Sequence, residues 1–438
     1  MTRPHEALCF RPERKGRPEP GSRAADPRGC APPVAQPEAP AEPVQLTIWQ
    51  VPNHPEMERL ILEAVAPYEE ENNVTVETVI LPWDSMDQMW TSAVQSGETP
   101  SFGYTYDSRL PDWYRMGAVA ALDDYISDDL RSAFLAEPLK SATYQGKTYA
   151  LPVLLTSDAM YYNKAILAEA GVEVPDDPLY SPSWEEFLGW LKQVADAGYY
   201  GWDSQGFQGV YDHIYDDFYM RFGCDVLNDT QDGFAFDQPG CLRAAEAWAE
   251  LGTTPGLQPP KALTTGWNRS EAFLEGTTAF CDFWVGLAGR LEDDYPEIEW
   301  GVMRPWHEEQ HKCYLGIGYY AVFADAENLE ESIDLALWLA DAERQTEWNS
   351  HVGTFPAMAI EGMYDDTTPG RATVGRVVEY NLSSGDAKFV LPWKGNVRWG
   401  NEVFNPNREA LQLGKMTPEE FLEKVQEGGI KIWAEENE

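Results

Sequence analysis

The sequence predicts an α/β protein made of two lobes that are joined by a hinge and enclose an interlobe cleft. Two observations support this fold class. Strand-like and helix-like segments alternate over residues 44–106, and that order implies parallel strands in one open sheet. Further along, two strand-like segments meet at the polar joint 156–158, which Pro152 precedes. We interpret this joint as a crossover of the chain from one lobe to the other.

The first lobe is predicted from three strands with two helices between them. The strands are rich in β-branched and aromatic residues, and the helices have apolar side chains at helical spacing. In chain order these elements are 44–50, 56–71, 74–81, 85–96 and 100–106. Ligands of parallel sheets bind beyond the carboxyl ends of the strands. We therefore expect Asn53, Trp83, Tyr106 and Asp107 at the mouth of a ligand site.

The second lobe is predicted from further strands that alternate with helices. The expected strands are 159–163, 199–202, 277–283 and 299–304, and the following strand, 314–323, is expected to return the chain to the first lobe. Aromatic and short polar residues stand together in or near several of these segments. The candidate ligand contacts in this part are Trp202, Asp282, Trp284, Tyr319 and Trp393. Sugar rings pack C–H faces on aromatic rings and need polar partners for their hydroxyls, so this composition favours a carbohydrate ligand.

The charge of the chain narrows the range of partners. The net charge is −41 at pH 7, and the first 45 residues, with seven basic and six acidic side chains, contribute almost none of it. An acidic folded part repels phosphate polymers and anionic small molecules, so we expect no nucleic acid partner. No apolar run approaches the roughly eighteen residues that a membrane span needs.

One catalytic motif occurs by letter, at His307-Glu308-Glu309-Gln310-His311. The zinc-peptidase mechanism needs this motif on a helix that places both histidines on one face. Pro305 precedes it and strand-like residues follow it, so we interpret the segment as a polar loop and predict no metal site. No phosphate-binding loop, dinucleotide loop or nucleophile elbow occurs, so we expect neither a cofactor nor catalysis.

Several motifs, in this order, resemble those of a known family. They are GKTYALP over 146–152, YYNK over 161–164, SWEEF over 183–187 and FDQPG over 236–240. Together they resemble the extracellular solute-binding proteins of ABC importers, in the maltose-binding-protein-like group that binds carbohydrates. The resemblance extends from about residue 45 to the carboxyl terminus.

The resemblance implies a periplasmic-binding-protein fold of type II, whose cleft captures a neutral oligosaccharide for delivery to a membrane permease. It also implies that the protein is a monomer and that it catalyses no reaction. Trp284 and Trp399 fall where the family commonly stacks a sugar, and we expect Asp158 to make the acidic contact at the hinge. The predicted lobes are 44–152 with 314–339, and 156–312 with 343–438.

The amino-terminal segment 1–43 holds ten of the 32 prolines and is predicted to be a disordered linker. Residues 1–29 lack the apolar region of a signal peptide, although the family is secreted. Cys30, followed by a Pro/Ala-rich spacer, resembles the start of a mature lipoprotein. We therefore expect an extracellular or periplasmic, membrane-anchored protein, with either a wrong recorded start or a lost export signal.

An oxidising exterior makes disulfides possible. Cys224 and Cys241 flank one polar excursion, and Cys281 and Cys313 lie in strands that we expect to be adjacent. The alternative is four buried thiols. Two alternative functions also stay open. One is a binding protein for a polyamine or another small cation, held between aromatic faces and carboxylates, and the other is an acidic glycoside hydrolase.

Overall fold

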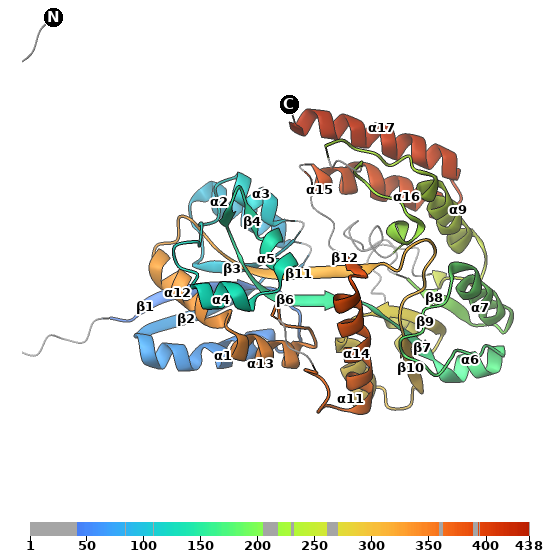
Figure 1. Ribbon diagram of the computed structural model, residues 1–438, viewed down its shortest axis with the longest axis horizontal. Coiled ribbons are helices and arrows are strands. Elements are labelled where there is room, and N and C mark those ends of the chain that lie inside the picture. The colour runs from blue at the N-terminus through green and yellow to red at the C-terminus, as the bar shows by residue number, and fades with distance from the viewer. Residues whose placement is uncertain are drawn as a thin grey trace, which may run out of the picture. The chain divides into compact units, whose positions relative to one another are not determined.

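Two β-sheets organise the protein, and Figure 1 shows the computed structural model in which they lie in separate lobes. The structure describes residues 42–83, 85–107, 109–204, 218–228, 232–260, 270–358, 362–388, 393 and 395–437. The segment Pro43–Glu438 is one unit. The predicted fold class, with two α/β lobes, is confirmed. In the described part of the chain, no helix has the length and apolar character to cross a membrane.

The sheet of the first lobe runs in the order β12-β11-β3-β1-β2, and β6 pairs with β11 along residues 315–320, off this path. Its strands are β1 Val44–Gln50, β2 Val74–Ile80, β3 Phe102–Tyr106, β6 Leu151–Ser157, β11 Cys313–Val322 and β12 Ala387–Lys388. β1 is parallel to both β2 and β3, as predicted, whereas β11 is antiparallel to β3 and β6. Because every residue of β11 is buried, this strand forms the middle of the molecule.

Helices and one small hairpin complete the first lobe. They are α1 Met57–Asn72, α2 Met86–Ser96, α3 Leu110–Arg115, α4 Asp128–Ala133, α5 Ala136–Ser141, β4 Thr143–Tyr144, β5 Lys147–Thr148, α12 Leu329–Leu339 and α13 Ala342–Val352. The predicted boundary differs at α13, which the sequence analysis placed in the second lobe. The Gln345 and Asn349 amides donate to the Pro152 and Val153 carbonyls, both at 3.0 Å, so α13 packs on β6.

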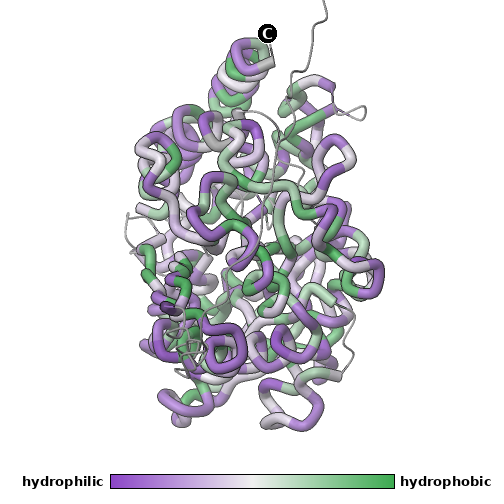
Figure 2. The backbone as a smooth tube through the Cα atoms, turned by 90° about the vertical axis from the view of Figure 1, so that its left-hand side faces the viewer, coloured by the Kyte–Doolittle hydropathy of each residue, from purple (hydrophilic) through white to green (hydrophobic). Residues whose placement is uncertain are grey.

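The sheet of the second lobe has the order β10-β7-β9-β8. Its strands are β7 Ala159–Asn163, β8 Tyr200–Asp203, β9 Thr278–Phe283 and β10 Trp300–Met303. Its helices are α6 Lys164–Ala170, α7 Trp184–Asp196, α9 Pro239–Thr253, α10 Glu271–Leu274, α11 Gly286–Asp293 and α14 Pro369–Ser384. A carboxyl-terminal group follows, with α15 Asn396–Trp399, the π-helical turn Gly400–Phe404, α16 Asn405–Gln412 and α17 Pro418–Asn437. Figure 2 looks at the molecule from the side of the first lobe, where hydrophilic residues gather on the outward turns of the backbone.

The helices begin and end where local chemistry predicts. Ser183 caps α7, because its hydroxyl accepts a hydrogen bond from the Glu186 amide at 3.2 Å. Asn163 caps α6 in the same way, and Gly171 ends that helix in the left-handed conformation that glycine adopts without strain.

Among the described residues, three connections between the lobes stand out. The first is at Asp158, between β6 and β7, because β6 continues through Ser157 in the first sheet. The second is the loop 304–312 between β10 and β11, and the third joins α13 to α14. These connections are the places where the two lobes would rotate against each other.

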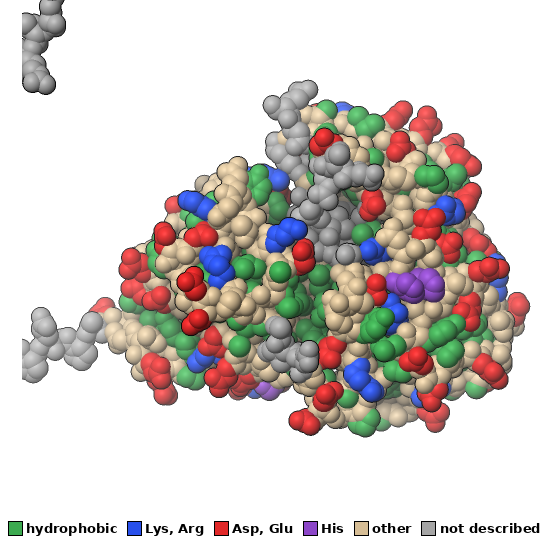
Figure 3. Space-filling view, in the orientation of Figure 1, with side chains coloured by type: hydrophobic (Ala, Val, Ile, Leu, Met, Phe, Trp, Pro, Cys, Tyr) green, Lys and Arg blue, Asp and Glu red, His purple; other side chains and the backbone are tan. Residues whose placement is uncertain are grey.

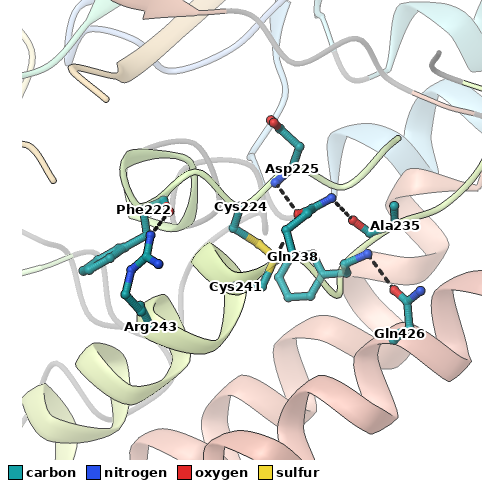
Figure 4. The surroundings of a disulfide bond; sticks show 9 residues. Phe222, Cys224, Asp225, Ala235, Gln238, Cys241, Arg243 and Gln426 are labelled. Atoms are coloured by element: carbon teal, nitrogen blue, oxygen red, sulfur yellow. Dashed lines mark hydrogen bonds between the residues drawn. A yellow bond between two sulfur atoms is a disulfide. The ribbon is translucent and has the colours of Figure 1, made fainter. Parts of the chain in front are cut away.

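The disulfide between Cys224 and Cys241 is confirmed and ties Cys224, the second residue after the 3₁₀ turn Tyr219–Phe222, to the first turn of α9 (Figure 4). Gln238 stands beside it, with its side chain accepting from the Asp225 amide at 3.0 Å and donating to the Ala235 carbonyl. The bond therefore closes a loop that is also held by hydrogen bonds.

The predicted disulfide between Cys281 and Cys313 is wrong. Both side chains are buried thiols. Cys281 lies in β9, opposite Tyr161 of the second sheet, whereas Cys313 lies in β11 of the first sheet. The Cys313 sulfur accepts a hydrogen bond from the Ser157 hydroxyl at 3.4 Å. The two strands, β9 and β11, which β10 separates in the chain, are in different sheets.

Candidate ligand-binding cleft

A cleft of about 830 Å³ lies where the two lobes and the third crossover meet. Residues 52–58, which follow β1, form one side of it, and residues 283–294, which follow β9, form the other. The end of α13, at Ser350–Gly353 in sequence, completes the lining together with Tyr364 and Arg371. Figure 3 shows acidic side chains spread over both lobes and hydrophobic ones in the hollow between them.

Trp284, next to Phe283, is an aromatic residue that the second lobe presents to this cleft. It is half-buried and follows β9 directly. Its backbone carbonyl accepts a 2.8 Å hydrogen bond from the Tyr161 hydroxyl, and its ring lies edge-on to Phe283. A side chain at Gly286 would come within 2.8 Å of the indole nitrogen, so the ring rests against the start of α11. The position of Trp284 is therefore fixed before any ligand binds.

The first lobe contributes Asn53 to the lining of the cleft, whereas the other three predicted contacts of this lobe, Trp83, Tyr106 and Asp107, lie beside that lining and not in it. Asn53 forms a side-chain hydrogen bond with Tyr104, the neighbour of Tyr106 two residues back in β3. Trp83 lies edge-on to both tyrosines, at 6.1 and 6.2 Å between ring centroids, and 48% of its surface is exposed. Asp107 is buried beside them and raises the pKa of Tyr104 further, although burial is the main cause of that rise.

Arg109 holds this aromatic wall in place. Its Nε donates to the Tyr106 hydroxyl at 3.0 Å, and its guanidinium pairs with Asp87 of α2. An aromatic surface with Asn, Asp and Arg side chains at its edge has the composition that a sugar needs, because the rings accept C–H faces while the polar groups bind hydroxyls.

The charges in the cleft are mixed. Arg371 pairs with Glu292 at 3.6 Å and with Asp293 at 3.3 Å, and Arg290, Glu58 and Asp294 also line the space. Neither sign dominates the lining, although the chain as a whole is strongly acidic. A ligand without net charge meets no large opposing field in such a cleft.

His54 also lines the cleft and is kept neutral. Burial lowers the pKa of His54 below its usual 6.5, and Arg59 and His351 act in the same direction while Glu56 opposes them. Its Nδ1 accepts a 3.1 Å hydrogen bond from the Glu56 amide, which leaves Nε2–H as the donor of the neutral ring.

The structure does not bring every predicted contact to the cleft. Trp202 and Asp282 are both buried, and the Trp202 indole donates to the Asp282 carboxylate at 2.8 Å. Tyr319 is fully buried in the middle of β11, where its hydroxyl lies 2.6 Å from the Ser141 hydroxyl. Asp158 is 1% exposed at the first crossover, and its backbone carbonyl accepts from the Asn381 amide. These four residues belong to the interior.

The prediction that Trp399 stacks a sugar is wrong for this structure. Trp399 has no exposed surface, and its indole donates to the Val425 carbonyl of α17 at 3.3 Å. Phe234, Phe236 and Phe404 surround it at 5.0 to 5.7 Å between ring centroids. Trp393 is likewise buried, against Phe234 and Trp433. Both tryptophans are core residues of the second lobe, because α17 and the segment around Phe234 cover them.

Sequence reasoning missed the part of the lining that the end of α13 supplies. Ser350, His351 and Gly353 follow from the position of α13 on β6, which the sequence analysis had assigned to the other lobe. The glycine-containing segment after this helix was the sequence signal from which this part of the lining could have been predicted. The two histidines of the zinc-peptidase motif lie outside the cleft, in the predicted loop, and among the described residues no three metal-binding side chains gather.

Comparisons with known proteins agree with this architecture. The sequence model of the bacterial extracellular solute-binding proteins matches residues 63–366. The galactooligosaccharide-binding protein of Bacillus subtilis is 22% identical over 400 residues, which cover 87% of this chain and 88% of that protein.

Two solved structures show the same fold. The ABC substrate-binding protein of Listeria monocytogenes in complex with cycloalternan has a TM-score of 0.78 at 18% identity, over 90% of this chain and 99% of that one. The solute-binding protein of Thermotoga lettingae bound to α-D-tagatose has a TM-score of 0.77 at 19% identity, over 89% and 100%. Since the family model matches well over half of the residues, the chain belongs to the family of bacterial extracellular solute-binding proteins.

Proposed function

We propose that the protein captures a neutral oligosaccharide in the cleft and delivers it to the membrane permease of an ABC importer, without performing chemistry on it. The observation that carries this proposal is the position of Trp284, which the second lobe presents to the cleft opposite the Asn53 loop of the first lobe. The names of the Bacillus subtilis relative and of the two solved structures, all sugar-related, support the ligand class.

The ligand contacts that we propose are Asn53, Trp83, Tyr106, Asp107 and Trp284. A sugar that touches the first group of four and Trp284 at the same time gains contacts only when the lobes approach each other. Closure therefore follows from the better contacts of the closed state. Scattering in solution should show a smaller radius of gyration with saturating ligand, and an unchanged radius would contradict closure.

The protein is further proposed to act as an exported monomer that a lipid on Cys30 anchors to the membrane. Cys30 lies outside the described residues. Metabolic labelling with a fatty acid should mark the parent and not a Cys30→Ala variant, provided that the natural host exports both.

A thermal-shift screen tests the ligand class directly. A ligand that binds only the native state stabilises that state and so raises the melting temperature. At a ligand concentration of one hundred times its Kd, the free energy of unfolding rises by about 2.7 kcal/mol. Maltodextrins, galactooligosaccharides and monosaccharides form one arm, and spermidine and free amino acids form the other. A shift with spermidine alone would replace the carbohydrate proposal by cation binding. Release of shorter sugars during the assay would instead support a glycoside hydrolase.

A further inference from the structure

The two histidines of the loop 304–312 lie face to face. The ring centroids of His307 and His311 are 3.9 Å apart, and the ring planes differ by 26°. The loop is the second crossover, since it leaves β10 of the second sheet and enters β11 of the first. The function proposed above does not use this pair.

Ser181 determines where the proton of His307 resides. The Ser181 hydroxyl donates its one hydrogen to the Pro305 carbonyl at 2.7 Å. Its oxygen, 3.0 Å from His307 Nδ1, must therefore accept from that nitrogen. In the neutral ring the proton is consequently on Nδ1, and a second proton would have to enter at Nε2.

The histidine stack lies between a part of the loop that is hydrogen-bonded to the second lobe and the start of β11. His307 is bound to the second lobe through its amide, which donates to the Pro182 carbonyl, and through its carbonyl, which accepts from the Trp184 amide. His311 lies two residues before Cys313, the first residue of β11. Movement of the His311 ring away from His307 would therefore act on the start of that strand.

An ion pair closes the same loop from the other side. Arg304 donates to the Asp386 carboxylate at 2.6 Å, and the Asp386 carbonyl accepts from the Cys313 amide at 3.1 Å. Asp386 lies between α14 and β12, so this pair joins the loop to the end of α14. Both ends of the loop are thus held, and the histidine stack lies between them.

The charges around the two rings oppose their protonation. Burial is the main cause that lowers the pKa of His307, and Arg304 adds to it, while the Pro182 carbonyl, Glu308 and Glu186 of α7 oppose the shift. Burial also lowers the pKa of His311, with contributions from His307 and Arg304, while Asp386 opposes it. Glu308, Glu186 and Asp386 therefore offset only part of the lowering, and the pKa of each ring stays below its usual value.

We propose that the His307–His311 stack is a pH-sensitive clasp on the second crossover, closed at neutral pH and opened when both imidazoles are protonated. Two neutral rings, or one neutral and one charged ring, remain in contact at 3.9 Å. Two charged rings at that distance repel each other, beside the further positive charge of Arg304. Because burial lowers both pKa values below the usual 6.5, the clasp is closed at and above that pH and opens only once the pH has fallen below both values.

Histidine titration by NMR tests the coupling without a ligand. In the parent, His307 and His311 should titrate in two separate steps, both below the usual imidazole range, because the second proton enters beside the first. In His311→Phe the ring contact remains but its charge is removed, so the second step should disappear. His351→Phe, which alters a histidine outside the loop, should leave both steps in place. A single independent titration of each ring in the parent would overturn the proposal.

Hydrogen exchange shows whether the clasp opens. The amides of Cys313, His307 and Trp184 are compared at pH 7.5 and at a pH below both titration steps found by NMR, corrected for intrinsic exchange. Protection should fall by about tenfold or more in the parent at the lower pH, because repulsion between the charged rings raises the population of the open form. In His311→Phe it should not fall. High salt should reduce the loss in the parent, because salt screens the repulsion between the rings. Equal protection at both pH values in the parent would show that the stack is no clasp.

Discussion

The indole nitrogen of Trp202 lies 2.8 Å from the carboxylate of Asp282, and both side chains are buried in the second lobe. Each had been predicted to contact the ligand. In the structure they are instead hydrogen-bonded to each other, on the neighbouring strands β8 and β9. A buried indole N–H and a buried carboxylate both need a partner, and this contact supplies one to each.

Trp202→Phe should therefore reduce stability and leave ligand affinity nearly unchanged. The variant removes the donor and leaves a buried carboxylate with one hydrogen bond fewer, which costs about 1–3 kcal/mol. Urea unfolding measures this loss, and a double-mutant cycle with Asp282→Ala isolates the contact. If the variant had normal stability but bound its sugar weakly, Trp202 would instead be a ligand contact.

Trp284→Ala should weaken binding while the fold remains intact. Loss of the stacking surface costs on the order of 1–3 kcal/mol, which corresponds to roughly ten- to hundredfold in Kd. Titration calorimetry with the sugar that gives the largest thermal shift measures the change. Trp83→Ala should act in the same direction with a smaller effect.

Trp399→Ala is the matched control for this prediction, because it removes the same side chain from the core. It should lower the free energy of unfolding by about 3–5 kcal/mol, as other large-to-small core substitutions do, without a comparable change in Kd of the folded protein. Parent-like affinity in Trp284→Ala, or a stable Trp399→Ala variant with lost binding, would reverse the two assignments.

The pH dependence of stability should include a contribution from His54. Burial lowers its pKa in the folded state below the usual 6.5, so the unfolded chain binds more protons between those two values. Stability from this group is thus present above pH 6.5 and is lost as the pH falls through the folded-state value. The melting temperature of the parent should fall more between pH 7.5 and pH 5 than that of His54→Asn. Parallel curves for the two proteins would show that His54 is no source of this dependence.

The cysteine assignment predicts a specific alkylation pattern. In denaturant without a reductant, iodoacetamide should modify Cys281 and Cys313 and leave Cys224 and Cys241 unmodified. Peptide mass spectrometry distinguishes these four positions. Removal of the disulfide by Cys224→Ser with Cys241→Ser should cost about 2–4 kcal/mol, because the unfolded chain regains the freedom of the closed loop. Modification of all four residues would contradict the pairing.

Local sequence patterns determined the two-lobed α/β class of this protein. The period of apolar residues, the caps at Ser183 and Asn163 and the glycine at 171 act over a few residues each, so they are visible without the fold. The parallel order of the first three strands followed from the helices between them. The same short-range argument identified Asn53, in the loop after β1, and Trp284, directly after β9. Both follow strand ends that reach the cleft.

Only the tertiary structure decided which aromatic residues reach the ligand. Trp284 and Trp399 were equivalent in sequence terms, yet Trp399 is covered by Val425, Phe234 and Phe404, from segments that are far from it or follow it in the chain. In the same way, only the structure shows that Cys281 and Cys313 lie in different sheets. It also shows that α13 is hydrogen-bonded to β6 and so belongs to the first lobe. Burial of a side chain depends on what packs over it, and that is a property of residues distant in sequence, which local periodicity does not contain.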